Sequence, residues 1–246
     1  MRKTVLATAL AAAAAMPGLA AAQASSPHSI SGNMGIFTDY RFRGISQTFD
    51  QPAIQGGIDY SHSSGFYLGN WNSNVNGLVF TDGSIEMDFY GGYKFNAGPI
   101  GMDVGLLEYL YPGAQTSAGD KYDTLEGYVA GSWKWFTVKY SYALSDFFSL
   151  QNSDGSGYLD IGFSMEIAPK LTLVAHYGNQ KVKNYSASDY SDYKVGVSYD
   201  LAGWALGAAY IGTDADSAVY TITSPATNKQ KDLGDGTVVL SVSKSF

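Results

Sequence analysis

The chain reads Ile85-Glu86-Met87-Asp88-Phe89-Tyr90-Gly91-Gly92-Tyr93-Lys94-Phe95. If this stretch is extended, its odd-numbered residues form one face that is mostly apolar and aromatic. The even-numbered residues form the opposite face, which carries the charges of Glu86, Asp88 and Lys94. Because an α-helix would mix the two sets around its circumference, the alternation predicts a β-strand with two unlike faces.

The same alternation recurs along the chain, for example from Leu159 to Glu166 and from Tyr193 to Leu201. We expect about twelve strands of about ten residues each, the length with which a tilted strand crosses the hydrocarbon core of a membrane. They fall near residues 30–43, 51–61, 66–74, 84–95, 100–111, 122–133, 136–144, 156–166, 171–180, 191–201, 204–213 and 237–246.

Short links alternate with long ones between these strands. The short links are 63–65, 96–99, 134–135, 168–170 and 202–203, and the longer polar links are 44–50, 75–83, 112–121, 145–155, 181–190 and 214–236. Short periplasmic turns that alternate with longer extracellular loops are typical of an outer-membrane barrel. A soluble β-sandwich, the alternative, does not predict this alternation. The expected fold is therefore all-β, a transmembrane antiparallel up-and-down β-barrel.

The composition agrees with a barrel in lipid. Only 15% of the residues are charged, whereas soluble domains have about 25%. Aromatic residues gather near both ends of the expected strands, as in the two aromatic girdles of membrane barrels. At the short-link end these are Tyr60, Phe66, Tyr93, Phe95, Trp133, Phe136, Trp204 and Phe246, and at the long-link end they are Tyr40, Phe42, Tyr109, Tyr111, Tyr142, Tyr158, Tyr177 and Tyr210.

The N-terminal residues have the layout of an export signal. Arg2 and Lys3 precede an alanine-rich apolar run, which Pro17 interrupts before the small residues that end at Ala22. We expect a cleavable signal peptide over residues 1–22 and one barrel domain over 23–246. Loss of Arg2 and Lys3 changes the net charge from −7 to −9. This acidic balance argues against nucleic acid as a partner.

The chain ends on a final amphipathic strand whose last residue is Phe246. A terminal phenylalanine of this kind resembles the signal that the bacterial barrel-assembly machinery reads. Lys244 occupies a position where another apolar residue is usual, and near the membrane interface its charge can reach water. We therefore expect Phe246 to act as the assembly signal, and we expect the assembly machinery and outer-membrane lipids as partners.

The polar faces of the expected strands carry many charges, which would be costly in a dry core. They indicate a hydrated lumen, whose acidic excess modestly favours cations, or a plugged lumen held together by ion pairs. With the lumen hydrated, the expected pore-lining residues are Asp39, Arg41, Arg43, Glu86, Asp88, Lys94, Asp103, Glu126, Lys139, Asp160, Glu166, Lys194 and Asp200.

Arg41 and Arg43 are two residues apart, so both should enter the lumen if the first strand extends that far. Opposed to acidic residues, they could create a transverse field at a constriction, since charged side chains of this kind set selectivity in pores. The alternative is that they brace the first loop against the wall. The link 214–236 is the longest, and it could fold into the mouth as a gate, bind a molecule outside, or be a mobile decoration, which is the favoured alternative.

Motifs for catalysis are weak in this sequence. His28 lies near the start of the mature chain, His62 lies at a turn, and only His176 lies inside an expected strand. No Ser/His/Asp order, metal-ligand spacing or phosphate loop stands out, and cysteine is absent. We therefore expect no enzyme, no cofactor and no metal. A barrel enzyme that acts on lipids through His176 remains the less favoured alternative.

The first third of the mature chain resembles a known family. The resemblance rests on the run Thr38-Asp39-Tyr40-Arg41-Phe42-Arg43-Gly44-Ile45-Ser46-Gln47-Thr48, on 52–60 and 65–75, and on Glu86-Met87-Asp88-Phe89-Tyr90-Gly91-Gly92-Tyr93. These residues resemble the TorF family of proteobacterial porins, also called the Gcw-chp family. The resemblance is looser after residue 95. It implies an outer-membrane barrel with a transport role, but no substrate and no site residues.

From these features we expect a bacterial outer-membrane, porin-like channel for passive diffusion of small hydrophilic solutes or ions. The second possibility is a structural or surface-interaction barrel with a plugged lumen.

Overall fold

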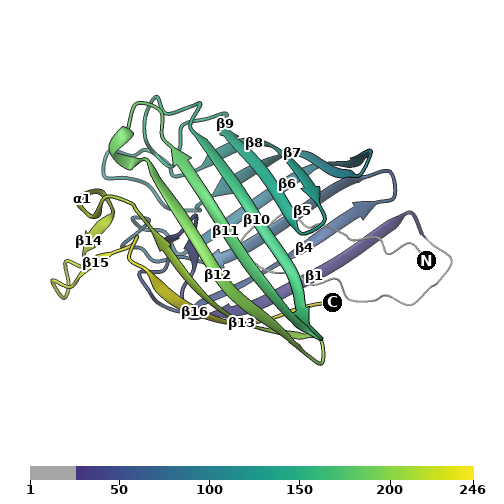
Figure 1. Cartoon of the computed structure of the whole chain (residues 1–246). Coiled ribbons are helices and arrows are strands. Elements are labelled where there is room, and N and C mark those ends of the chain that lie inside the picture. Colours follow the sequence, from purple (N-terminus) through teal and green to yellow (C-terminus); the bar gives the residue numbers. More distant parts are fainter. Residues whose placement is uncertain (1–25) are drawn as a thin grey trace.

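Twelve strands form one closed antiparallel barrel in the computed structural model, which describes residues 26–246 (Figure 1). Strands adjacent in the sequence pair with one another, and β1 closes the ring on β16. The barrel strands are β1 (His28–Phe37), β4 (Ala53–His62), β5 (Phe66–Asn74), β6 (Ile85–Ala97), β7 (Ile100–Leu110), β8 (Thr124–Trp133), β9 (Phe136–Ala143), β10 (Gly157–Ala168), β11 (Leu171–Lys181), β12 (Tyr190–Leu201), β13 (Trp204–Thr213) and β16 (Thr237–Ser245).

The remaining elements are short and lie in the long links. They are β2 (Arg41–Phe42), β3 (Ile45–Ser46), a 3-10 turn at Ser186–Ser188, α1 (Ser217–Tyr220), β14 (Thr221–Thr223) and β15 (Gln230–Asp232). The long links gather at one end of the barrel, which we name the loop end (Figure 1). The short links, the start of β1 and the C-terminus lie at the other, the turn end. No helix within residues 26–246 has the length and apolar character needed to cross a membrane.

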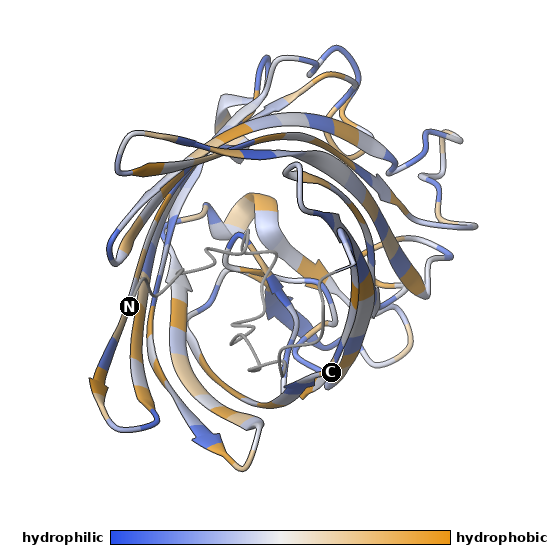
Figure 2. Ribbon diagram, turned by 90° about the vertical axis from the view of Figure 1, so that its right-hand side faces the viewer, coloured by the Kyte–Doolittle hydropathy of each residue, from blue (hydrophilic) through white to orange (hydrophobic). Residues whose placement is uncertain are grey.

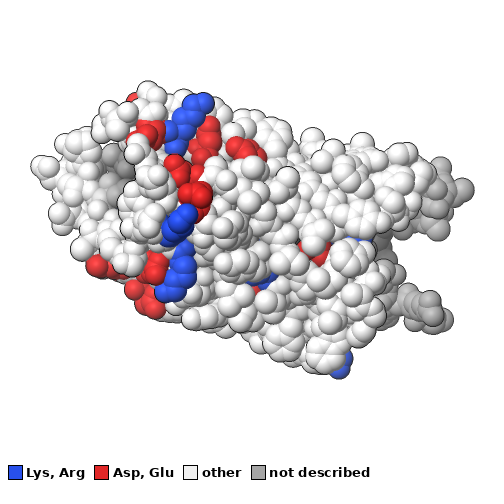
Figure 3. All heavy atoms as spheres, turned by 90° about the horizontal axis from the view of Figure 1, so that it is seen from above, with Lys and Arg blue, Asp and Glu red and all other residues white. Residues whose placement is uncertain are grey.

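Hydrophobic and hydrophilic residues alternate along the strands (Figure 2), and the hydrophobic ones form an exposed outer face. Ile30, Ile54 and Val238 point outward and are 60% exposed or more. Charged side chains on the face seen in Figure 3 gather mostly at the loop end. A wall of exposed apolar residues, interrupted by few charges, is the surface that a bilayer solvates.

The predicted all-β barrel with twelve strands is confirmed, and β5 and β13 have the predicted bounds. The first strand was predicted too long: β1 ends at Phe37, not at residue 43. Thr38 still contacts the wall, because its N–H donates to Leu240 O at 3.0 Å and its hydroxyl accepts from Leu240 N at 3.0 Å. The chain then leaves the sheet. The predicted signal peptide lies outside the described residues.

Phe246 closes the seam between the first and last strands. Its backbone exchanges hydrogen bonds with Gly32, at 2.7 and 2.9 Å. Its ring lies over Gly32, where a Cβ atom would be 2.7 Å from the nearest ring carbon. Only glycine leaves room for the ring at this position, so the last residue of the chain is fitted to the first strand.

Candidate functional site

The inward positions of the strands carry most of the charges predicted for the lumen. Glu86 and Asp88 on β6 are buried, whereas the next residue, Phe89, faces outward and is 45% exposed. Ten of the predicted residues occupy such inward positions: Glu86, Asp88, Lys94, Asp103, Glu126, Lys139, Asp160, Glu166, Lys194 and Asp200. The other three, Asp39, Arg41 and Arg43, lie in the link between β1 and β4.

This link, residues 38–52, folds into the barrel, and we name it the inward loop. Asp39 organises it, because its carboxylate accepts hydrogen bonds from Ser46 Oγ at 2.7 Å and Thr48 Oγ1 at 2.9 Å. Arg43 and Gly44 have φ angles of 46° and 83°, which reverse the chain into the β2–β3 hairpin. The prediction that Arg41 and Arg43 extend the first strand is therefore wrong. Positive φ angles end the strand geometry that the alternation suggested.

Arg43 crosses the lumen to the opposite wall. Its Nη2 donates to both carboxylate oxygens of Glu126 on β8, at 2.8 and 2.7 Å, and its Nη1 donates to Gln180 Oε1 on β11 at 2.7 Å. The guanidinium also lies 4.2 Å from the ring centre of Tyr158 on β10. Burial alone would lower the pKa of Arg43, but the Glu126 carboxylate raises it, so the guanidinium stays charged. The inward loop is thus anchored on the far side of the barrel.

Arg41 faces the loops and not the open lumen. Its Nη1 donates to Leu233 O at 2.8 Å and to Asp235 O at 2.9 Å, and its Nη2 donates to Asp50 at 3.0 Å. Asp50 also pairs with Lys231. The residues from 230 to 235 belong to the link 214–236, which we name the mouth loop. Its packing on the inward loop fits the gate alternative better than a mobile decoration.

Aromatic residues fill the loop-end half of the barrel. Tyr40 on the inward loop donates to Glu86 Oε1 at 2.8 Å and meets Trp71 edge to face. The prediction of a loop-end girdle is wrong for five residues, which lie inside the barrel and not on its outer face. They are Tyr40, Phe42, Tyr109, Tyr111 and Tyr158. By contrast, Tyr142, Tyr177 and Tyr210 are exposed on the outer face. An inward loop of this size provides an apolar surface that the sequence pattern does not show.

Water has more access to the lumen toward the turn end. The side chain of Lys94 is 36% exposed and that of Asp160 is 20% exposed, whereas Glu126 near the loop end is 2% exposed. Lys94 lies 4.0 Å from Asp103, whose side chain is 13% exposed, so water reaches this ion pair mainly from the lysine side. The lumen is therefore more open toward the turn end, and the inward loop narrows its loop-end half.

Two carboxylates on the inner face of β6 have no cationic partner within the described chain. Glu86 and Asp88 are buried, and neither forms an ion pair within 4.0 Å among residues 26–246. Tyr40 satisfies one oxygen of Glu86, but Glu86 Oε2 and Asp88 Oδ1 have no hydrogen-bond partner there. The narrow part of the lumen therefore holds more acidic than basic groups.

His176 is engaged by carboxylates on both sides. Its Nδ1 lies 3.0 Å from Asp160 Oδ1, and its Nε2 lies 2.7 Å from Asp192 Oδ1. Tyr158 OH donates to the second oxygen of Asp192 at 2.8 Å. Neither ring nitrogen faces a serine, so this arrangement is that of a structural ion network and not of a Ser/His hydrolase.

Two inward carboxylates were missed in the prediction of the lumen residues. Asp59 on β4 accepts from Tyr90 OH at 2.6 Å, and Asp192 on β12 holds His176. The alternation itself contained the signal for Asp59, which shares the polar face of its strand. Asp192 lies at the start of its strand, where the predicted boundary was least certain.

A family model described as "Bacterial protein of unknown function (Gcw_chp)" matches residues 21–246. No curated protein matches the chain. Among solved structures, the chain is similar to KdgM porin with a TM-score of 0.54 at 12% identity, covering 88% of this chain and 99% of the other.

It is similar to NanC porin with a TM-score of 0.51 at 11% identity, covering 89% and 99%. It is also similar to KdgM porin in complex with disordered oligogalacturonate, with a TM-score of 0.51 at 10% identity, covering 88% and 98%. At these identities the likeness is one of fold.

Proposed function

The chain belongs to the Gcw_chp family, and we propose that it is an outer-membrane channel through which small hydrophilic solutes and ions diffuse passively. One observation carries the proposal: the barrel is apolar on its outer face and lined with charges on its inner face. A protein dissolved in water would bury its apolar residues and not its ionic ones. The inverse arrangement suits a lipid exterior and a hydrated interior.

The narrow part of the proposed passage lies where the inward loop meets the wall. Arg43 pairs there with Glu126 on β8, and Glu86 and Asp88 lie two strands away on β6. A cation opposite several carboxylates creates a transverse field, and such groups set the selectivity of pores. The proposed constriction therefore contains Arg43, whereas Arg41 only packs the inward loop against the mouth loop.

The charge balance of the lumen supports cations and neutral solutes over anions. Nine inward carboxylates face three inward lysines on the strands, and Arg43 and His176 add to the basic side. The carboxylates are Asp59, Glu86, Asp88, Asp103, Glu126, Asp160, Glu166, Asp192 and Asp200, and the lysines are Lys94, Lys139 and Lys194. Oligogalacturonate, found with the similar KdgM porin, is a polymer of acidic sugars. This lumen would repel such a chain.

We also propose that residues 1–22 direct export and that Phe246 is read by the barrel-assembly machinery. The fit of Phe246 to Gly32 gives the last strand a defined partner at the seam. In the outer membrane, the turn end would face the periplasm and the loop end the outside, as is usual for such barrels.

Liposome swelling tests this function. Liposomes that contain the refolded mature chain should swell in a neutral monosaccharide or in a small amine salt, and more slowly in sodium galacturonate. Equal rates for the amine and the galacturonate would contradict the charge argument. No swelling in any solute would favour the second candidate, a plugged structural barrel, which the filled loop-end half supports.

A further inference from the structure

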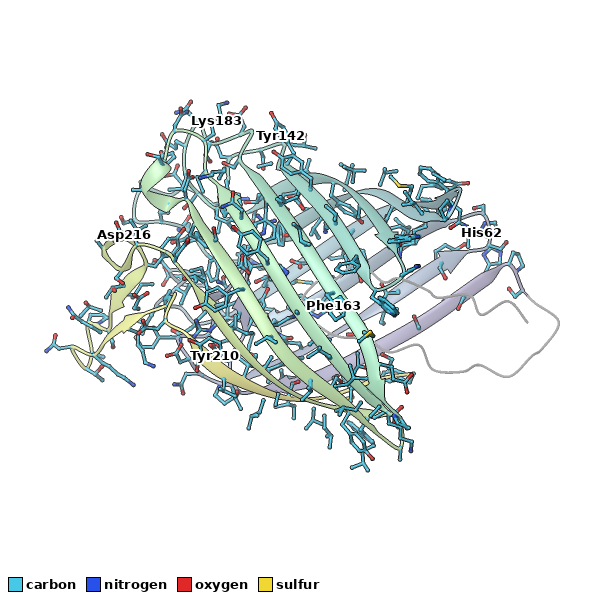
Figure 4. All side chains as sticks on the ribbon, in the orientation of Figure 1. His62, Tyr142, Phe163, Lys183, Tyr210 and Asp216 are labelled. Carbon is cyan, nitrogen blue, oxygen red and sulfur yellow. The ribbon has the colours of Figure 1, made fainter. Side chains whose placement is uncertain are left out.

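Two of the three histidines in the chain face each other at the turn end of the barrel. His28 begins β1 and His62 ends β4, and the two are direct partners in the register between these strands. Their ring centres are 5.1 Å apart. Figure 4 shows His62 at this end of the molecule, far from Lys183 and Asp216 at the loop end. The pair therefore lies outside the lumen that the proposed function uses.

Neighbouring hydroxyls hold the same nitrogen of each ring. His28 Nδ1 lies 2.7 Å from Tyr60 OH, and His62 Nδ1 lies 2.8 Å from Ser64 Oγ. The backbone N–H of Ser64 also donates to His62 Nδ1 at 3.2 Å, so this nitrogen accepts in the metal-free chain. Both Nε2 atoms are left without a partner among the described residues. Metal-binding histidines have this arrangement, in which an outer group orients the ring through the nitrogen that does not bind the metal.

The separation of the rings matches that of two imidazoles on one ion. A metal lies about 2.0–2.1 Å from an imidazole nitrogen, and so roughly 3.2 Å from the ring centre. Two rings at a tetrahedral angle on one ion then have centres about 5.2 Å apart. The observed 5.1 Å agrees with this value. The strand register alone brings the rings to this distance.

From this geometry we propose that His28 and His62 form a surface site for a first-row divalent metal ion at the turn end. Imidazole ligands suit Cu²⁺, Ni²⁺ and Zn²⁺, while Ca²⁺ and Mg²⁺ need oxygen ligands. No group of three metal-ligating residues occurs within residues 26–246, so water completes the coordination. Among these ions Cu²⁺ binds most tightly by the usual order of affinities. When the ion binds His62 Nε2, the ring proton passes from Nε2 to Nδ1 through water and is donated to Ser64 Oγ, and this bond replaces the one from the Ser64 backbone N–H.

The test uses Cu²⁺ and the full mature chain, refolded in detergent without a histidine tag. Calorimetry should give one tight site per chain, and the electron paramagnetic resonance spectrum should show two imidazole nitrogens on the ion. His28→Ala and His62→Ala should each weaken binding by more than about 100-fold, because each removes a ligand. Ser64→Ala should weaken it by about tenfold, as loss of an orienting group does.

His176→Gln is the matched control, because it removes the third histidine and leaves the proposed ligands intact. Heat-dependent migration on gels checks that each variant is folded. Binding that persists in the His28→Ala and His62→Ala double variant would overturn the proposal. So would a spectrum with a single nitrogen, or loss of the site in His176→Gln. The outcome does not depend on whether the barrel conducts.

Discussion

Arg43 on the inward loop and Glu126 on β8 meet across the barrel as a buried two-pronged ion pair, with distances of 2.8 and 2.7 Å. The side chains are 7% and 2% exposed. The pair joins the loop between β1 and β4 to a strand on the other side of the barrel, and it fixes the inward loop across the lumen.

Removing one member of this pair should destabilise the barrel. Arg43→Ala leaves a buried carboxylate without its cation, which costs about 3–5 kcal/mol. Arg43→Ala with Glu126→Ala should recover part of this loss, a coupling of about 0.5–3 kcal/mol. Urea unfolding of the barrel in lipid vesicles measures both. Lys183→Ala, which breaks an exposed pair with Asp154, is the control and should cost less than about 1 kcal/mol. Additive effects of the two substitutions would exclude the ion pair.

The tip of the inward loop should accept only glycine. Gly44 has a φ of 83°, and a Cβ atom there would be 2.7 Å from Asp192 Cβ and closer still to Thr213. Gly44→Ala should therefore displace the tip from the wall and increase the unit conductance. Gly203→Ala is the matched control, because Gly203 has the same φ and no atom within 4 Å. If the two variants have the same conductance, the tip does not define the passage.

Asp50 should hold the mouth loop closed. It pairs with Arg41 of its own loop and with Lys231 of the mouth loop. In Asp50→Asn, trypsin should cut after Lys229 and Lys231 roughly fivefold faster, as loss of a partly exposed pair of about 1 kcal/mol predicts. Asp154→Asn removes a comparable pair elsewhere at the loop end and should leave these rates unchanged. An unchanged rate in Asp50→Asn would show that other contacts hold the loop.

The unpaired carboxylates should set the ion preference. Glu86→Gln with Asp88→Asn removes the negative charge that this carboxylate pair contributes to the lumen, so cation selectivity should fall, as a reversal potential in a potassium chloride gradient reports. Stability should not fall, because buried charges without partners are costly. Asp216→Asn is the control, since Asp216 caps α1 at the loop end and asparagine also caps helices. An unchanged reversal potential would place the selective region elsewhere.

The wall of this barrel could be predicted from the sequence, because alternation of side chains is a local property. The segments 66–74 and 204–213 are strands with the predicted bounds, and the inward side chains of β6 follow the same rule. The alternation of link lengths gave the topology for a similar reason, since each link joins neighbouring strands.

The inward loop could not be predicted in this way. Asp39, Arg41 and Arg43 alternate with Tyr40 and Phe42, so they continue the strand pattern although β1 ends at Phe37. The positive φ values at Arg43 and Gly44 turn the chain into a hairpin. Gly44 was the one local feature of the sequence that indicated such a turn. The partner of Arg43 lies 83 residues away on the opposite wall. Spacing along the sequence does not encode contacts across a lumen.

The most direct test of this account is single-channel conductance in planar bilayers for the wild type and for Arg43→Ala. If the lumen is a water-filled passage narrowed by the inward loop, the wild type should show small, stable, cation-preferring steps. Arg43→Ala should show larger ones, because the loop loses its anchor on β8 and β11. A wild type and a folded Arg43→Ala variant that both show no steps would contradict the proposed channel.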